Sequence, residues 1–210
     1  MRLDPEGKKF IYVFLILALF CVLTRSLVGF VIAGVFVLLA LFSLFFFRDP
    51  EREPPDDEMI LVSPADGRVV FAGEYNDPAF GPSLRIGVFM SLADVHINRA
   101  PFGGVVELVE HADGGFKHAA SQKAFGQNER QSVFISTEKG AIVVHQIAGM
   151  VARRIVCRVK EGQKLERGEK IGMIRFGSRV EVIMPQLECI LLVKEGDKVK
   201  CGKSAIAKWI

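Results

Sequence analysis

VKEGQKLERGEKI, at residues 159–171, returns as VKEGDKVKCGKSA at residues 193–205. Both copies share the frame V-K-E-G-x-K-h-x-x-G, in which h is an apolar residue. Each copy places a glycine where a turn needs a positive φ, between a strand and its antiparallel return. The repeat therefore predicts two similar tight turns, each flanked by short strands.

The sequence from Met59 to Ile210 predicts a β-rich domain around this repeat. Its apolar runs are short, β-branched and interrupted by Gly, Pro and Asp. We expect strands at residues 68–71, 84–89, 105–109, 132–136, 141–146, 155–159, 180–183 and 189–193. With its paired turns, the pattern resembles the barrel-sandwich hybrid of lipoyl and biotinyl carrier domains, so the predicted fold class is mainly β. Two plain hairpins are the simpler alternative, and a shared fold alone implies no function.

The strongly apolar sequence lies almost entirely before Arg48, in the runs 10–23 and 27–47. As a helix, the second run is long enough to cross a hydrocarbon core of roughly 30 Å, whereas the first is shorter, and whether it crosses fully stays open. We expect a transmembrane helical hairpin within a membrane anchor at residues 1–48. A charged, proline-rich linker at 49–58 then leads to the β-rich domain at 59–210.

Basic residues flank the outer ends of both apolar runs: Arg2, Lys8 and Lys9 before the first, and Arg48 and Arg52 after the second. By the positive-inside rule, we expect both ends, and with them the β-rich domain, on the cytoplasmic side of the cell membrane. A secretory signal peptide is the competing interpretation. It is disfavoured because no small-x-small cleavage site follows the first run, and a second apolar run does.

Charge and cysteine usage exclude other classes of protein. The net charge of +3 is small and dispersed, which argues against a nucleic-acid partner. The cysteines show no C-x-x-C spacing and no clustering with histidine, so we expect reduced thiols and no metal site. These cysteines are Cys21, Cys157, Cys189 and Cys201.

Between the two copies of the repeat lies the dipeptide Gly177-Ser178, where the backbone itself could become a cofactor. A serine hydroxyl can attack the preceding glycine carbonyl, because glycine has no Cβ to block the approach and tolerates strained dihedral angles. The peptide becomes an ester, and loss of the Ser178 α-proton then expels the ester oxygen by β-elimination. Hydrolysis of the resulting dehydroalanine leaves a pyruvoyl ketone at a new N-terminus. A Gly-Ser pair alone is a weak signal, so its context decides.

Four segments supply that context, and they resemble the phosphatidylserine decarboxylases, particularly the short, membrane-anchored branch of bacteria and archaea. They are SPADG at 63–67, DVHINRAP at 94–101, the stretch from Gly115-Phe116 to Asn128-Glu129-Arg130, and FGSR at 176–179. Each motif alone is weak, but four in the expected order over nearly the whole chain are specific.

The resemblance implies a proenzyme that cuts itself between residues 177 and 178. The products would be a β subunit, residues 1–177, and an α subunit, residues 178–210, headed by a covalent pyruvoyl cofactor. Its ketone would condense with the headgroup amine of phosphatidylserine and act as the electron sink while CO₂ departs, which gives phosphatidylethanolamine. The implied partners are the membrane phospholipid and the paired subunits. Diacyl or archaeal ether tails, and assembly into a homo-oligomer, stay open.

The resemblance also implies roles for residues near the cleaved bond. We predict His96 as general acid and base, since imidazole titrates near neutral pH. Asp66 could orient that histidine or help to deprotonate Ser178, although Ala-Asp-Gly is also an ordinary turn sequence. Long members of the family carry a second histidine where this chain has Arg99. The self-cleavage base therefore stays open, and Arg99 could bind a carboxylate or phosphate.

Further candidates for binding substrate are weaker, because solvated loop charges and a structural strand histidine would look the same. The arginine and lysine among them could take the lipid phosphate. These candidates are Lys117, Asn128, Glu129, Arg130 and His145.

Two other classes of function remain as alternatives. A carrier module would present a modified lysine between its half-repeats, where this chain offers Arg175 and Arg179, so a carrier is disfavoured. A membrane-tethered adaptor would likewise need no reactive bond. A membrane-bound serine hydrolase would use Ser178 and His96 on external substrates and stay one polypeptide.

Overall fold

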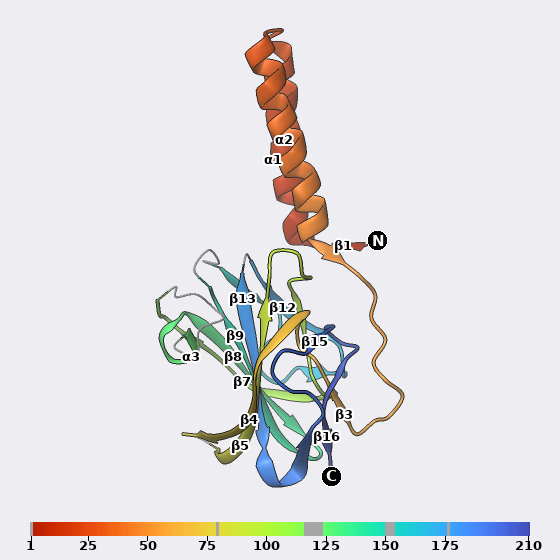
Figure 1. Cartoon of the computed structure of the whole chain (residues 1–210), viewed down its shortest axis with the longest axis vertical. Helices are drawn as coiled ribbons and strands as arrows, with labels where there is room; N and C mark the ends of the chain where they lie inside the picture. The colour runs from red at the N-terminus through yellow and green to blue at the C-terminus, as the bar shows by residue number, and fades with distance from the viewer. Residues whose placement is uncertain (1, 79, 116–123, 150–153, 176) are drawn as a thin grey trace. The chain divides into compact units, whose positions relative to one another are not determined.

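The computed structural model describes residues 2–78, 80–115, 124–149, 154–175 and 177–210. They form two compact units, Met1–Glu51 and Arg52–Ile210. In the first unit, helices α1 (Pro5–Leu23) and α2 (Leu27–Phe46) run side by side (Figure 1), and the short strands β1 (Arg2–Leu3) and β2 (Arg48–Asp49) pair beside their ends. Both expected helices are therefore present.

The helix starts follow from capping. Asp4 accepts a hydrogen bond from the backbone N–H of Glu6 at the start of α1, and Ser26 accepts one from Gly29 at the start of α2, both at 3.0 Å. Among the described helices, α2 alone is long and apolar enough to cross a membrane. One apolar N-terminal helix could thus anchor the chain.

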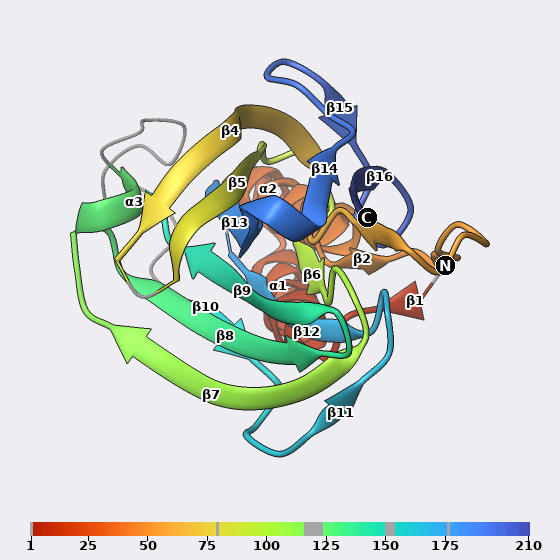
Figure 2. The ribbon, with the colours of Figure 1, turned by 90° about the horizontal axis from the view of Figure 1, so that it is seen from below.

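The second unit is built on an eight-stranded antiparallel sheet, which curls into an arc (Figure 2). In spatial order its strands are β11 (Lys164–Leu165), β7 (Gly104–Ala112), β8 (Arg130–Thr137), β9 (Gly140–Ile147), β13 (Ser178–Pro185), β5 (Gly81–Met90), β4 (Gly67–Asp77) and β15 (Lys198–Val199). All eight strands expected from the sequence are present in the unit, most with longer bounds. The fold class is mainly β, as predicted.

Two three-stranded sheets pack inside this arc. The first comprises β10 (Ile155–Cys157), β12 (Lys170–Ile174) and β6 (Ile97–Arg99), and the second comprises β14 (Cys189–Leu191), β16 (Ala205–Trp209) and β3 (Ile60–Val62). A four-residue helix, α3 (Ala124–Gln127), and a 3₁₀ turn, η1 (Gln186–Glu188), complete the described elements. The hydrophobic core lies between the large sheet and the small ones, where side chains such as Val180, Ile86, Ile171 and Trp209 are buried.

The internal repeat forms the two edges of the large sheet. The backbone N–H of Gly162 donates to Val106 O at 2.8 Å, and that of Gly196 donates to Val69 O at 2.9 Å. The two glycines have φ of 79° and 94°, in the left-handed region that glycine favours. Each copy then adds a two-residue strand, β11 or β15, to opposite edges of the sheet. The prediction of two equivalent turns is confirmed.

Candidate active site

Ser178 is the first residue of β13, at the centre of the large sheet, and pairs with Met90 at the end of β5. Its side chain is fully buried, and Oγ has no hydrogen-bond partner among the described residues. A buried hydroxyl left in this state is costly, so it is a sign of a functional group.

The preceding residue, Gly177, has a φ of 65°. A Cβ built on it would meet no atom within 4 Å, so the conformation of the backbone, and not lack of space, is what favours glycine there. Phe176, the first residue of the FGSR motif, lies outside the described residues.

His96 comes directly before β6 and is fully buried. Its Nδ1 lies 3.0 Å from the carbonyl oxygen of Asp94. Because a carbonyl can only accept, Nδ1 carries the proton, which leaves Nε2 as the basic nitrogen of the ring. The backbone N–H of Ile174 donates to His96 O at 3.3 Å, which ties the histidine to the end of β12, just ahead of Gly177-Ser178.

A buried amide pair connects His96 to the strand neighbour of Ser178. Asn98 lies in β6, two residues beyond His96. The Asn98 amide donates to Met90 Sδ at 3.6 Å, and Met90 is the residue opposite Ser178. Gln146 of β9 donates to Asn98 Oδ1 at 2.8 Å. Sequence reasoning missed Gln146, although an amide among buried apolar strand residues was a signal.

Asp66 connects the second copy of the repeat to Arg52. Its Oδ1 accepts the backbone N–H of Cys201 at 2.7 Å, and its Oδ2 accepts from Arg52 at 3.0 Å. Arg99 contacts the first copy of the repeat, because its Nη1 donates a hydrogen bond to Gly168 O at 2.8 Å. Asp66 thus contacts the second copy of the repeat and Arg99 the first. The roles predicted for these side chains toward His96, Ser178 or substrate stay predictions.

Cys201, whose backbone N–H donates to Asp66, also has a buried thiol. The Cys201 Sγ lies 3.2 Å from Pro64 O, and burial raises the pKa of this thiol. Cys201 is therefore an inert, packed side chain.

The remaining substrate-binding candidates divide into two groups. Asn128 is buried and donates to Ala148 O at 2.7 Å, and the backbone N–H of Glu129 donates to Gly115 O at 3.1 Å, so these residues connect loops at the same end of the sheet as Ser178. Lys117 lies outside the described residues.

His145 and Arg130 form the second group. His145 pairs with Glu181, three residues from Ser178 on β13, so His145 and Ser178 point to opposite faces of the sheet. Both candidates line a cavity of about 260 Å³ on that other face. The structure therefore does not bring either side chain together with Ser178.

His145 is held neutral in this place. Its Nδ1 contacts Ser132 Oγ at 2.8 Å, and burial, with a contribution from the positive charge of Arg130, lowers its pKa to about 4. The imidazole is therefore neutral at physiological pH.

A buried ion cluster follows Ser178 along β13. Arg179 and Glu181 form an ion pair with both side chains fully buried, and Arg85 Nε lies 3.8 Å from Glu181. A Cβ on Gly87 would lie 2.6 Å from the Arg179 guanidinium, so only glycine leaves room for it. Burial raises the pKa of Glu181 against the opposing effect of both arginines. The cluster lies where β13 pairs with β5, and sequence reasoning missed it.

Comparison with known proteins agrees with this geometry. The family model described as phosphatidylserine decarboxylase matches residues 39–207. A phosphatidylserine decarboxylase proenzyme of Syntrophus aciditrophicus is 44% identical over 80% of this chain and 80% of its own length. The proenzyme of the same name from Trichlorobacter lovleyi is 42% identical over 98% of this chain and 96% of its own length. That from Pelobacter propionicus is 40% identical over 97% of this chain and 94% of its own length. A buried serine after a left-handed glycine, a buried histidine tied to the end of β12 and these similarities lead to one conclusion: the chain belongs to the phosphatidylserine decarboxylase family of enzymes.

Proposed function

We propose that this chain cuts its own backbone between Gly177 and Ser178, and that a pyruvoyl group made from Ser178 decarboxylates phosphatidylserine to phosphatidylethanolamine and CO₂. The observation that carries the proposal is the enclosed Ser178 hydroxyl, without a partner among the described residues, directly after a glycine at φ 65°. The family match adds to it.

The first step is an N-to-O acyl shift, in which Ser178 Oγ forms a bond to the Gly177 carbonyl carbon and the peptide C–N bond breaks. Removal of the Ser178 α-proton then releases the Gly177 carboxylate. Water replaces the nitrogen at position 178, and ammonia leaves. Glycine lowers the barrier to the first step, since no Cβ shields the carbonyl.

The residues around position 178 fit a small carbonyl group. Met90 is the cross-strand neighbour, and Asn98 contacts the Met90 side chain from the small sheet. When present, a pyruvoyl group supplies a ketone that binds the substrate amine and accepts electrons. The apolar and amide surroundings would exclude bulk water from it.

His96 is the proposed acid and base in this site. Its Nδ1–H is held by Asp94 O, so Nε2 can take or deliver a proton. Asp66 is tied to Arg52 and to the Cys201 backbone, so we propose it as a positioning residue for the turn of the second repeat.

The anchor would keep this site at the lipid surface. We propose that residues 1–48 hold the enzyme in the cell membrane, that 49–58 act as the linker, and that residues 59–210 work on the cytoplasmic side. The basic flanks of the apolar runs favour this orientation. The α subunit, residues 178–210, would remain bound because β13 pairs with β9 and β5.

Intact mass spectrometry of the full chain in neutral detergent tests the proposal. Wild type should give two pieces, with the smaller lacking an N-terminal amine and gaining mass with borohydride and an amine. Ser178→Ala should give one inactive, uncut polypeptide. The control Ser83→Ala removes another buried sheet serine, whose hydroxyl donates to Gly81 O, and should still be cut. Active wild-type protein in one unbroken piece would refute the proposal and favour a hydrolase.

A further inference from the structure

The side-chain amide of Asn98 lies across β13, on the face of the large sheet to which the Ser178 side chain points. Its nitrogen donates to Met90 Sδ at 3.6 Å, and its oxygen accepts from Gln146 at 2.8 Å. Met90 belongs to β5 and Gln146 to β9, and these are the two strands that flank β13. An amide that contacts side chains of both flanking strands lies over the strand between them.

The strand register places both contacts beside Ser178. Met90 is paired directly with Ser178. Their side chains therefore leave the sheet on the same face, with Cβ atoms roughly 4.5–5.5 Å apart. Gln146 is paired with Val180, two residues after Ser178 and on the same face. Diagonal neighbours of this kind are roughly 7–8 Å apart, which a long side chain can span. The Asn98 amide is thus held over the start of β13.

Polar atoms around this amide are incompletely paired. Ser178 Oγ and Gln146 Oε1 are buried and have no hydrogen-bond partner among the described residues. The Asn98 nitrogen has two N–H groups, and its contact with Met90 uses one of them on a thioether sulfur, which is a weak acceptor. Because buried polar groups are nearly always paired, an unpartnered hydroxyl next to a weakly bound donor points to a function.

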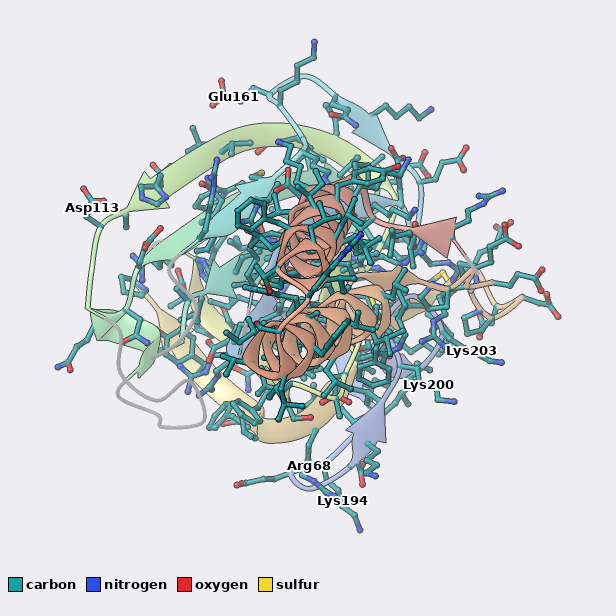
Figure 3. All side chains as sticks on the ribbon, turned by 90° about the horizontal axis from the view of Figure 1, so that it is seen from above. Arg68, Asp113, Glu161, Lys194, Lys200 and Lys203 are labelled. Atoms are coloured by element: carbon teal, nitrogen blue, oxygen red, sulfur yellow. The ribbon has the colours of Figure 1, made fainter. Side chains whose placement is uncertain are left out.

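Water does not reach this part of the unit. Asn98, Gln146 and Met90 are all fully buried. Figure 3 shows exposed charged side chains projecting outward from the same unit instead: Arg68, Asp113, Glu161, Lys194, Lys200 and Lys203. A neutral donor held in place inside the protein stabilises a developing charge more than it would in water.

We infer that the Asn98 amide stabilises the negative charge that develops on Ser178 Oγ during self-cleavage, and that Gln146 positions this amide. The inference rests on the proposed function. A charged oxygen is a much stronger acceptor than the sulfur of Met90, so the Asn98 N–H turns to Oγ as the charge forms. Gln146 holds the amide oxygen, which keeps the nitrogen of Asn98 on the side of Met90 and Ser178.

The same oxygen atom carries negative charge in two steps. In the first step, Oγ gives its proton to a base and bonds to the Gly177 carbonyl carbon, while the peptide C–N bond breaks and the nitrogen takes a proton. In the second step, a base removes the α-proton of residue 178 and a Cα–Cβ double bond forms. The electron pair of the Cβ–Oγ bond then leaves on Oγ, as part of the Gly177 carboxylate. One donor directed at Oγ therefore lowers both barriers.

The test follows self-cleavage of the full chain, newly made in a cell-free system with neutral detergent, by gel and intact mass over time. Asn98→Leu keeps the branched shape but has no donor. It should be cut about 10²–10³-fold more slowly, the usual effect of losing one such donor. Hydroxylamine cuts the ester form of the chain, and it should not restore fast cutting, because the first step is slowed too. Rapid cutting by hydroxylamine would overturn the assignment to both steps.

A double variant separates chemistry from stability. Asn98→Leu leaves the Gln146 amide buried without its acceptor, whereas Asn98→Leu/Gln146→Leu replaces both partners with apolar groups, which should recover stability. The double variant should unfold at a higher denaturant concentration than Asn98→Leu and yet be cut as slowly. If cutting recovers together with stability, the amide pair only supports packing, and the inference is wrong.

Ser132→Ala is the matched control for lost stability. It removes a buried contact between neighbouring strands, from Ser132 Oγ to His145 Nδ1 at 2.8 Å, on the face of the sheet opposite to Ser178. This variant should lose stability and still be cut at the wild-type rate.

Other outcomes overturn the inference. Equal slowing in Ser132→Ala and Asn98→Leu would show that any loss of stability slows cutting. A wild-type rate of cutting in Asn98→Leu would refute the role of the amide and leave self-cleavage itself intact. A wild-type chain that is never cut would refute the proposed function, and this inference with it.

Discussion

Gln146 donates a hydrogen bond to Asn98 at 2.8 Å, and both side chains are fully buried. The bond joins β9 of the large sheet to β6, the strand that follows His96. Gly172 permits this approach, since a Cβ there would lie 3.0 Å from the Gln146 amide. The docking of β6 against the large sheet therefore includes a polar contact inside an apolar core.

Gln146→Leu should destabilise the protein by about 1–3 kcal/mol, because it leaves the Asn98 oxygen buried and unsatisfied. It should also slow self-cleavage by moving β6. Gel analysis of maturation over time and denaturant unfolding measure the two effects. Gln131→Leu on β8, which removes an exposed amide hydrogen bond to Glu110 O of β7, is the control. Normal maturation and stability of Gln146→Leu would contradict the role given to this bond.

Gly177→Ala should slow self-cleavage strongly, because a Cβ disfavours φ 65° by about 1–2 kcal/mol and shields the attacked carbonyl. Gly81→Ala is a closely matched control. Gly81 has φ 69° and equally open space around a built Cβ, but it is the first residue of β5, at the other end of that strand from the partner of Ser178. Both variants should lose similar stability, and only Gly177→Ala should accumulate uncut chain. Equal cleavage rates in the two variants would refute the prediction.

His96→Ala should lower decarboxylation or maturation by about 10²-fold or more, the usual contribution of a positioned acid or base. Rates of CO₂ release from mature protein, and cleavage of newly made chain, separate the two steps. His111→Ala changes a partly exposed histidine on β7 and serves as the control. Wild-type rates for both steps in His96→Ala would remove its catalytic role.

Arg179→Met should destabilise the folded protein by about 3–5 kcal/mol, because Glu181 would keep a buried carboxylate without its close partner. Arg179→Met/Glu181→Leu should recover most of this loss, because it also removes the buried carboxylate, and the remaining cation, Arg85, still lies over the rings of Phe71 and Tyr75. Urea unfolding of the two variants in detergent gives the comparison. If the double variant is as unstable as the single one, the loss of stability comes from the packing of these side chains and not from an unpaired buried charge.

His145 predicts a pH dependence of stability. Its pKa is about 4 in the folded state and near 6.5 when unfolded, so only the unfolded chain binds the proton between these values. Its contribution to stability should fall as pH drops from about 6.5 toward about 4, by a few kcal/mol at most. His145→Asn should show a smaller fall between pH 7 and 5 than wild type in thermal unfolding. Parallel curves would contradict the lowered pKa.

The repeat and the β-branched runs were enough to predict the class of fold and the longer strands. The missed strands β3, β6, β12 and β16 have only three to five residues each, and their buried positions alternate little. Their partners come from distant parts of the chain, as in β6 with β12, so tertiary pairing forms strands that local pattern does not indicate.

The predicted site rests on chemistry that neighbouring residues define, at Gly177-Ser178 and in the motif around His96, and these roles stay predictions. The site could not be predicted where side chains meet across sheets. His145 looked suitable for a pocket, but which face of β9 it occupies follows from its pairing with Glu181. In the same way, the contact of Asp66 with Cys201 depends on the docking of the second repeat.

The position of β13 has a consequence for how the cut enzyme would behave. Residues 178–210 supply β13 in the middle of the large sheet, β15 at one of its edges, and β14 and β16 of a small sheet. The short piece therefore pairs with strands of the longer piece in two sheets. Both pieces would copurify in a one-to-one ratio under native conditions, without exchange between molecules, and separate only in denaturant. A tag on Ile210 would therefore recover the membrane helices as well.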